Sequence, residues 1–122
     1  MLKKILLTLS LSTLFLVAND PLEVAIELCE YSKKADVDGM KEHASDAMLP
    51  QLNQISVMLK AAQSTPEGRA KLEEGLKIVA SVNCKKSTTL TKNSDGSFQV
   101  TNSSTKQQYT LKKFNKEWKF TQ

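Results

Sequence analysis

The stretch that decides the fold is SVNCKKSTTLTKNSDGSFQVTNSSTKQQYTLKKFNKEWKFTQ, residues 81–122. Apolar and polar side chains alternate along much of it, which is typical of strands that bury one face. The alternation predicts a first strand from Ser81 onward. Its buried face would carry Val82, Cys84, Thr88 and Leu90, with Lys86 as the exception.

Turn residues divide the rest of this stretch into three further strands. Asp95-Gly96 predicts a hairpin turn, after which Phe98 and Val100 continue the pattern. A polar turn is expected at 102–105, followed by a strand with Tyr109 and Leu111. Asn115-Lys116 then turns the chain into a closing strand that carries Trp118 and Phe120.

The preceding residues have the spacing of helices. Asp20-Pro21-Leu22-Glu23 combines a capping residue with a proline suited to a first turn, and this helix should end near Lys33-Lys34. Asp36 is the next expected cap, before a short helix with Val37, Met40, Ala44, Ala47 and Met48 on one side. Pro50 breaks or restarts that helix.

Two more helical stripes follow. Leu52, Ile55 and Leu59 define one helix. Ser64-Thr65-Pro66-Glu67 starts the next, whose apolar seam is Leu72, Leu76 and Val79. Helices followed by an antiparallel meander of about four strands make an α+β domain.

The N-terminus has the layout of a cleaved secretory signal. Lys3 and Lys4 precede an apolar run over 5–17, and Ala18 precedes a polar pair. Residues 1–18 are therefore predicted to be a signal peptide and residues 19–122 a single domain that is periplasmic or secreted. The alternative is an uncleaved anchor, because Leu16 is larger than the usual small residue near a cut. No later apolar run approaches the length of a membrane span.

Charge is distributed unevenly along the chain. Residues 19–83 have a balance of −4, whereas residues 84–122 have a balance of +6. Lysines of the second half could form a surface for anionic lipid, glycan or another polyanion, or simply a solvated face that keeps the sheet soluble. Neither an arginine cluster nor an aromatic stacking surface accompanies them, so we expect no nucleic-acid partner.

The chain has two cysteines, Cys29 and Cys84. In an exported protein such a pair predicts a disulfide, here between the first helix and the first strand. Two buried thiols are the alternative. Two distant cysteines and the single His43 fall short of a four-ligand metal site, so no metal or other cofactor is expected.

Two segments resemble small exported domains of the nuclear-transport-factor-2-like (cystatin-like α+β) superfamily, in particular bacterial families of uncharacterised function. They are the opening DPLEVAIELCEYSKKADVDGMKEHAS, residues 20–45, and the close YTLKKFNKEWKFTQ, residues 109–122. The resemblance implies a curved sheet around helices and a conical cavity. Candidates to line or fill that cavity are Phe98, Leu111, Trp118 and Phe120. The alternative is a plain packed core, the usual place for aromatic residues at strand spacing.

No catalytic motif stands out. His43 with Glu42 and Asp46 has the composition of an acid–base cluster, but pairing on a helix surface explains the spacing of His43 and Asp46. We therefore expect a non-catalytic exported module that binds a small apolar ligand or an envelope protein. A homodimer formed through the sheet is a further alternative. A small cavity enzyme of the isomerase or dehydratase type is the alternative.

Overall fold

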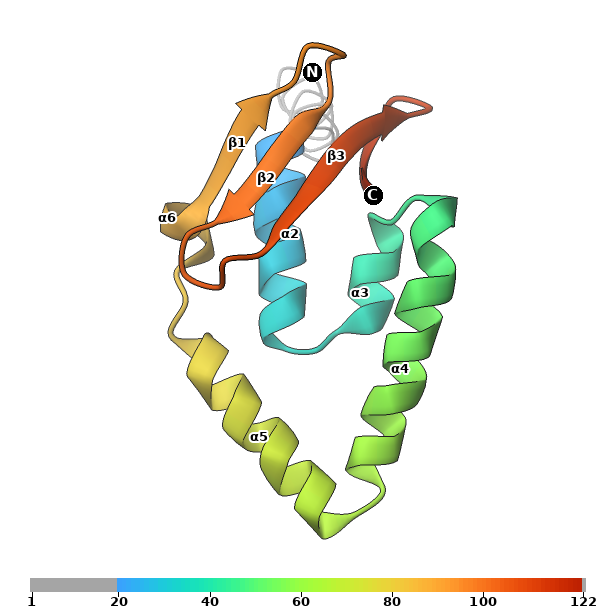
Figure 1. Ribbon diagram of the computed structural model, residues 1–122, viewed down its shortest axis with the longest axis vertical. Helices are drawn as coiled ribbons and strands as arrows, with labels where there is room; N and C mark the ends of the chain where they lie inside the picture. The colour runs from blue at the N-terminus through green and yellow to red at the C-terminus, as the bar shows by residue number, and fades with distance from the viewer. Residues whose placement is uncertain (1–19, 122) are drawn as a thin grey trace, which may run out of the picture.

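The computed structural model describes residues 20–121, and the predicted signal peptide and cleavage point lie outside that range. Helices come first and a four-stranded antiparallel sheet follows (Figure 1), which confirms the α+β class. Within these residues, no helix has both the length and the apolar character that a membrane span requires. The elements are α2 (Pro21–Lys33), α3 (Val37–Glu42), the 3₁₀ turn η1 (Asp46–Met48), α4 (Leu49–Gln63), α5 (Pro66–Ala80), α6 (Cys84–Ser87), β1 (Thr88–Lys92), β2 (Phe98–Asn102), β3 (Gln108–Phe114) and β4 (Glu117–Thr121).

Three helices begin at the caps expected from the sequence. The Asp20 carboxylate accepts a hydrogen bond from the Leu22 backbone N–H, and the Asp36 carboxylate accepts one from Gly39. The Thr65 hydroxyl does the same for the Gly68 N–H. Each cap satisfies an amide that has no partner inside its helix.

The helix expected to continue from residue 37 to residue 48 is shorter than predicted, since α3 ends at Glu42. The reason is a competing partner for the backbone. The His43 carbonyl accepts a hydrogen bond from the Phe120 N–H at 2.8 Å, and the Ser45 N–H donates to the Phe120 carbonyl at 3.0 Å. Residues 43–45 thus join the edge of the sheet beside β4, with Ala44 bridged to Phe120.

The sheet is a simple meander in the order β1-β2-β3-β4, as predicted. Gly96 occupies the first hairpin with a φ of 90°, a conformation that glycine adopts without strain. Asn115 and Lys116 both have positive φ in the last hairpin. Two such residues in succession match the twist of antiparallel strands, which explains the tight connection from β3 to β4.

Cys84 lies on a short helix, and the prediction that it belongs to the first strand was wrong. The Asn83 side chain caps this helix by accepting a hydrogen bond from the Lys86 N–H, and β1 begins only at Thr88. The exposed Lys86, which interrupted the alternation, is explained because that stretch is helical.

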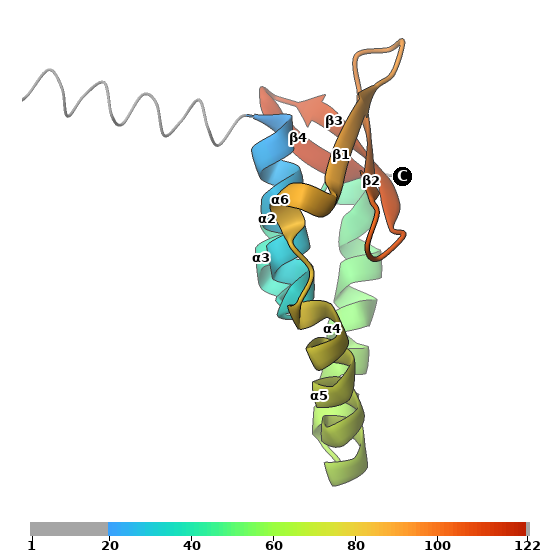
Figure 2. The same ribbon diagram turned by 90° about the vertical axis from the view of Figure 1, so that its left-hand side faces the viewer.

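The inner face of the sheet packs against α2. Val24, Ala25 and Leu28 of α2 form a core cluster with Val100 and Leu111 of the sheet. Figure 2 shows α2 and α3 standing on one side of the strands. Helices α4 and α5 extend away from the sheet, meet at the turn between them and diverge toward the sheet in a V (Figure 1), and α5 has no buried residue.

Candidate functional site

A cleft of about 320 Å³ lies between helices α2, α3 and α4 on one side and strands β3 and β4 on the other. Its size is near the lower end of the range for small-molecule pockets, roughly 300–1,000 Å³. Residues from α2, α3, η1, α4, β3 and β4 and the turn before β3 line it: Leu28, Ser32, Met40, Met48, Gln51, Leu52, Ile55, Gln107, Gln108, Tyr109 and Phe120.

The sheet side of the cleft is aromatic. Register places Leu111 opposite Phe120, so Tyr109 and Phe120 share the inner face of the sheet. Their rings lie edge to face with centroids 6.0 Å apart. Leu28 and Ser32 of α2 are four residues apart and therefore lie on the same side of that helix.

Helix α4 supplies the opposite wall. Leu52 is 3% exposed and anchors the helix, whereas Ile55, about one turn further along, is 36% exposed at the rim. Within the apolar stripe that predicted this helix, Leu52 packs in the core and also lines the cleft, whereas Ile55 lines the cleft at its exposed rim.

None of the residues that line this cleft is charged. Its polar groups are amides of three glutamines and the hydroxyls of Ser32 and Tyr109. Burial raises the pKa of Tyr109 above its ordinary value, because the phenolate would lose its hydration. The phenol therefore stays protonated at neutral pH and can donate a hydrogen bond.

A smaller pocket of about 30 Å³ shares Leu28, Ser32, Gln107 and Tyr109 with the cleft. Its lining also includes Thr88 and Asn102, which face each other as register partners of β1 and β2. The Thr88 hydroxyl oxygen is buried and has no hydrogen-bond partner among the described residues. We call this space the inner pocket.

The four residues proposed from the sequence to line a cavity are neighbours on the inner face of the sheet, but they differ in position. Phe120 lines the cleft. Leu111 is fully buried in the core, and Phe98 and Trp118 pack edge to face with centroids 5.2 Å apart. Their role in ligand binding stays a prediction.

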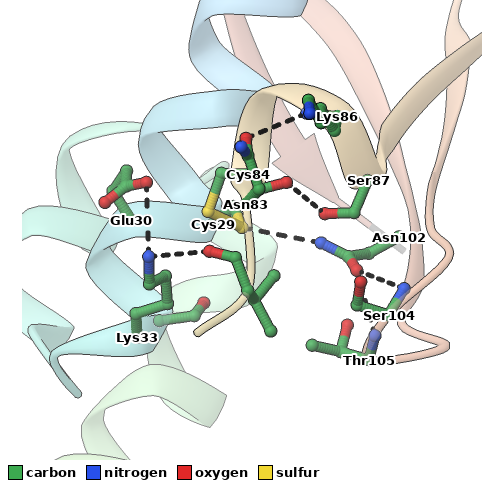
Figure 3. The surroundings of a disulfide bond; sticks show 12 residues. Cys29, Glu30, Lys33, Asn83, Cys84, Lys86, Ser87, Asn102, Ser104 and Thr105 are labelled. Carbon is green, nitrogen blue, oxygen red and sulfur yellow. Dashed lines mark hydrogen bonds and ion pairs between the residues drawn. A yellow bond between two sulfur atoms is a disulfide. The ribbon is translucent and has the colours of Figure 1, made fainter. Parts of the chain in front are cut away.

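The predicted disulfide is confirmed: Cys29 of α2 is bonded to Cys84 of α6 (Figure 3). Beside it, the Lys33 ammonium donates to the Val82 carbonyl at 2.8 Å and lies 3.8 Å from the Glu30 carboxylate. The Asn102 side-chain oxygen accepts from the Ser104 and Thr105 N–H groups, while its Nδ2 donates to Cys29 Sγ at 3.5 Å. These contacts join α2, α6 and the β2–β3 turn next to the inner pocket.

The helix-surface interpretation expected His43 to pair with Asp46, but the structure pairs it with Glu27. Its Nε2 lies 2.6 Å from a carboxylate oxygen of Glu27 on α2, because α3 ends at the residue before it. His43 is absent from the lining of the cleft and of the inner pocket. Within residues 20–121, no three His, Cys, Asp or Glu side chains gather where they could hold a metal ion.

Several lining residues were not singled out as site candidates in the sequence. Leu52 and Ile55 were visible as a helical stripe, and Tyr109 as an inward strand position. Nothing local marks the glutamines as lining residues, because a helix, a turn and a strand bring them to the cleft from separate parts of the chain. The unpaired hydroxyl of Thr88 likewise emerges only once β1 and β2 are in register.

Compared with known proteins, the chain matches no protein-family model, no curated protein and no solved structure.

Proposed function

We propose that this protein is an exported, non-catalytic module that binds a small apolar ligand in the cleft. The observation that carries the proposal is the lining itself: apolar and aromatic side chains from six elements, a few uncharged polar groups, and no charge. Ligand pockets in proteins have this composition, with polar groups that fix orientation. The nuclear-transport-factor-2-like resemblance, with its expected cavity, supports the same reading.

The alternative is a cavity enzyme of the isomerase or dehydratase type. Such chemistry needs an acid or a base within hydrogen-bond reach of the substrate. The cleft lining contains no carboxylate and no histidine, and its one titratable side chain is a phenol whose pKa is raised. This composition favours binding over acid–base catalysis.

Export is the second part of the proposal. A disulfide between Cys29 and Cys84 is compatible with the periplasm or the extracellular space, where such bonds persist. Intact-mass measurement of protein from the envelope fraction tests the predicted cleavage near Asn19. A mass that includes residues 1–18 would contradict it.

Binding is tested with N-phenyl-1-naphthylamine, an uncharged apolar fluorophore that brightens in an apolar site. Ile55→Glu places a charge at the rim of the cleft and should weaken binding at least tenfold, because a carboxylate loses hydration beside an apolar ligand. Val57→Glu is the matched control, on the same helix but 67% exposed and outside the cleft lining. Equal affinity of the two variants, or no binding by the native protein, would contradict the proposal.

An envelope protein, or a second copy of the chain joined through the sheet, is the other class of partner that we propose to test. Sedimentation of the mature protein over a range of concentrations distinguishes a monomer from a dimer.

A further inference from the structure

The strongest unexplained feature beside the cleft is the hydroxyl of Thr88. Thr88 is 8% exposed, and its Oγ1 is buried without a partner among the described residues. Buried hydroxyl groups are nearly always hydrogen-bonded in native proteins, because an unpaired one loses its water without compensation. The position therefore calls for a partner that comes from outside the chain.

Two neighbouring polar groups of the inner pocket are also weakly paired. The Ser32 hydroxyl donates to the Met40 sulfur at 3.6 Å, and the Asn102 Nδ2 donates to the Cys29 sulfur at 3.5 Å. Sulfur is a weak acceptor, so both groups can gain from an oxygen placed among them. The Asn102 amide cannot turn over, because its oxygen already accepts two backbone N–H groups.

The inner pocket has no charge to match an ion. Its lining is Ala25, Leu28, Cys29, Ser32, Thr88, Val100, Asn102, Gln107 and Tyr109. Lys33 lines an adjoining pocket, but its ammonium already contacts Glu30 and the Val82 carbonyl. A carboxylate or an ammonium placed here would be desolvated without a counter-charge, which is costly. A volume of about 30 Å³ accommodates one oxygen-sized group.

We propose that the ligand is an uncharged amphiphile whose hydroxyl or carbonyl oxygen enters the inner pocket and bonds to Thr88, while its apolar body lies in the cleft. This inference rests on the proposed function, since the same cleft binds the ligand. It adds the class of compound and its direction in the site: the polar end lies innermost, and the apolar body extends past Tyr109 and Phe120 toward Ile55.

The experiment is displacement of N-phenyl-1-naphthylamine from the mature protein at pH 8 by decan-1-ol or by decanoate. Decan-1-ol should bind at least tenfold more tightly than decanoate, since only the alcohol avoids burying a charge. Thr88→Val keeps the shape of the side chain but removes the hydroxyl, and should weaken decan-1-ol about fivefold to tenfold, the effect of one neutral hydrogen bond. Thr88→Ser should restore affinity, and Thr89→Val, on the opposite and exposed face of β1, should have no effect.

The outcomes separate the two proposals. If the fluorophore does not bind the native protein, the proposed function fails and this inference fails with it. If the fluorophore binds but decanoate equals decan-1-ol, only this inference is overturned. Unchanged decan-1-ol affinity in folded Thr88→Val protein also overturns it, because Thr88 then bonds to a structural water. The comparison of the alcohol with the carboxylate needs no variant, so it stands even if Thr88→Val does not fold.

Discussion

Removal of the Cys29–Cys84 disulfide should cost this domain much of its stability. The two cysteines are 55 residues apart in sequence, and the loop-closure relation for a loop of that length gives about 4 kcal/mol at 25 °C. Domains of this size are stable by only about 5–15 kcal/mol in total. Reduction should therefore leave the protein folded but clearly less stable.

Urea unfolding of oxidised and reduced protein, followed by Trp118 fluorescence, measures the effect. With a typical slope of about 2 kcal/mol per molar urea, the midpoint should fall by about 2 M. Cys29→Ala/Cys84→Ala is the control for side effects of the reductant, and its midpoint should match that of the reduced protein. The binding of N-phenyl-1-naphthylamine should weaken with it, because α6 leads directly into Thr88.

The reasoning fails if the two midpoints differ by less than about 0.5 M, which corresponds to about 1 kcal/mol. Lys33 also joins α2 to residue 82 by its hydrogen bond to the Val82 carbonyl, and so restrains the same two segments. Lys33→Met in the reduced protein measures that contribution separately, since it removes the hydrogen bond but keeps most of the side-chain volume.

Three further predictions concern single residues. Trp118→Ala should lower the free energy of unfolding by about 2–3 kcal/mol. This is less than the roughly 3–5 kcal/mol expected for a fully buried aromatic residue, because Trp118 is half-buried against Phe98. A change of less than about 1 kcal/mol in a urea melt would place the ring at the surface. His43→Ala should cost about 1 kcal/mol or less, because the Glu27 carboxylate that His43 contacts keeps 46% of its side chain exposed and can be solvated when the ring is removed. The variant should still complement a deletion strain when its level is normal. Failure of well-folded protein to complement would favour the enzyme alternative. Gly75→Ala should raise stability by about 0.5–1 kcal/mol, because a Cβ at this position in the interior of α5 meets nothing within 4 Å. Gly39→Ala should lower stability by about 1–3 kcal/mol, because its Cβ would lie 2.5 Å from the Tyr31 ring. Thermal melts of the two variants that shift in the same direction would contradict this pair of predictions.

The parts of the fold that could be predicted are those governed by neighbours in sequence. Asp20, Asp36 and Thr65 cap helices through amides two or three residues away, so short motifs were enough to place three helix starts. The hairpins at 95–96 and 115–116 depend likewise on local φ preferences. The disulfide could be predicted because two cysteines allow one pairing.

One error arose where a distant segment decides the local structure. Residues 43–45 leave the helical pattern because the backbone of Phe120 offers them hydrogen bonds across the chain. The error at Cys84 has a local cause: Asn83 caps a short helix there, whereas the alternation of apolar residues predicted a strand. The uncharged lining of the cleft depends on six elements coming together, and the surroundings of the Thr88 hydroxyl depend on the register of β1 with β2, so no single stretch of sequence predicts them.

The two walls of the cleft are held in different ways, and this difference bears on the proposed ligand. The α2 wall is fixed by the core cluster and the disulfide, and the inner pocket with Thr88 lies on this side. The α4 wall has one buried residue, Leu52, and is joined to the sheet through residues 43–45. Local opening follows the side with fewer buried contacts. On the proposed function, the hydrogen-bonding end of the ligand therefore meets a rigid surface that selects its chemistry, while its apolar body meets a helix that can adjust to its size.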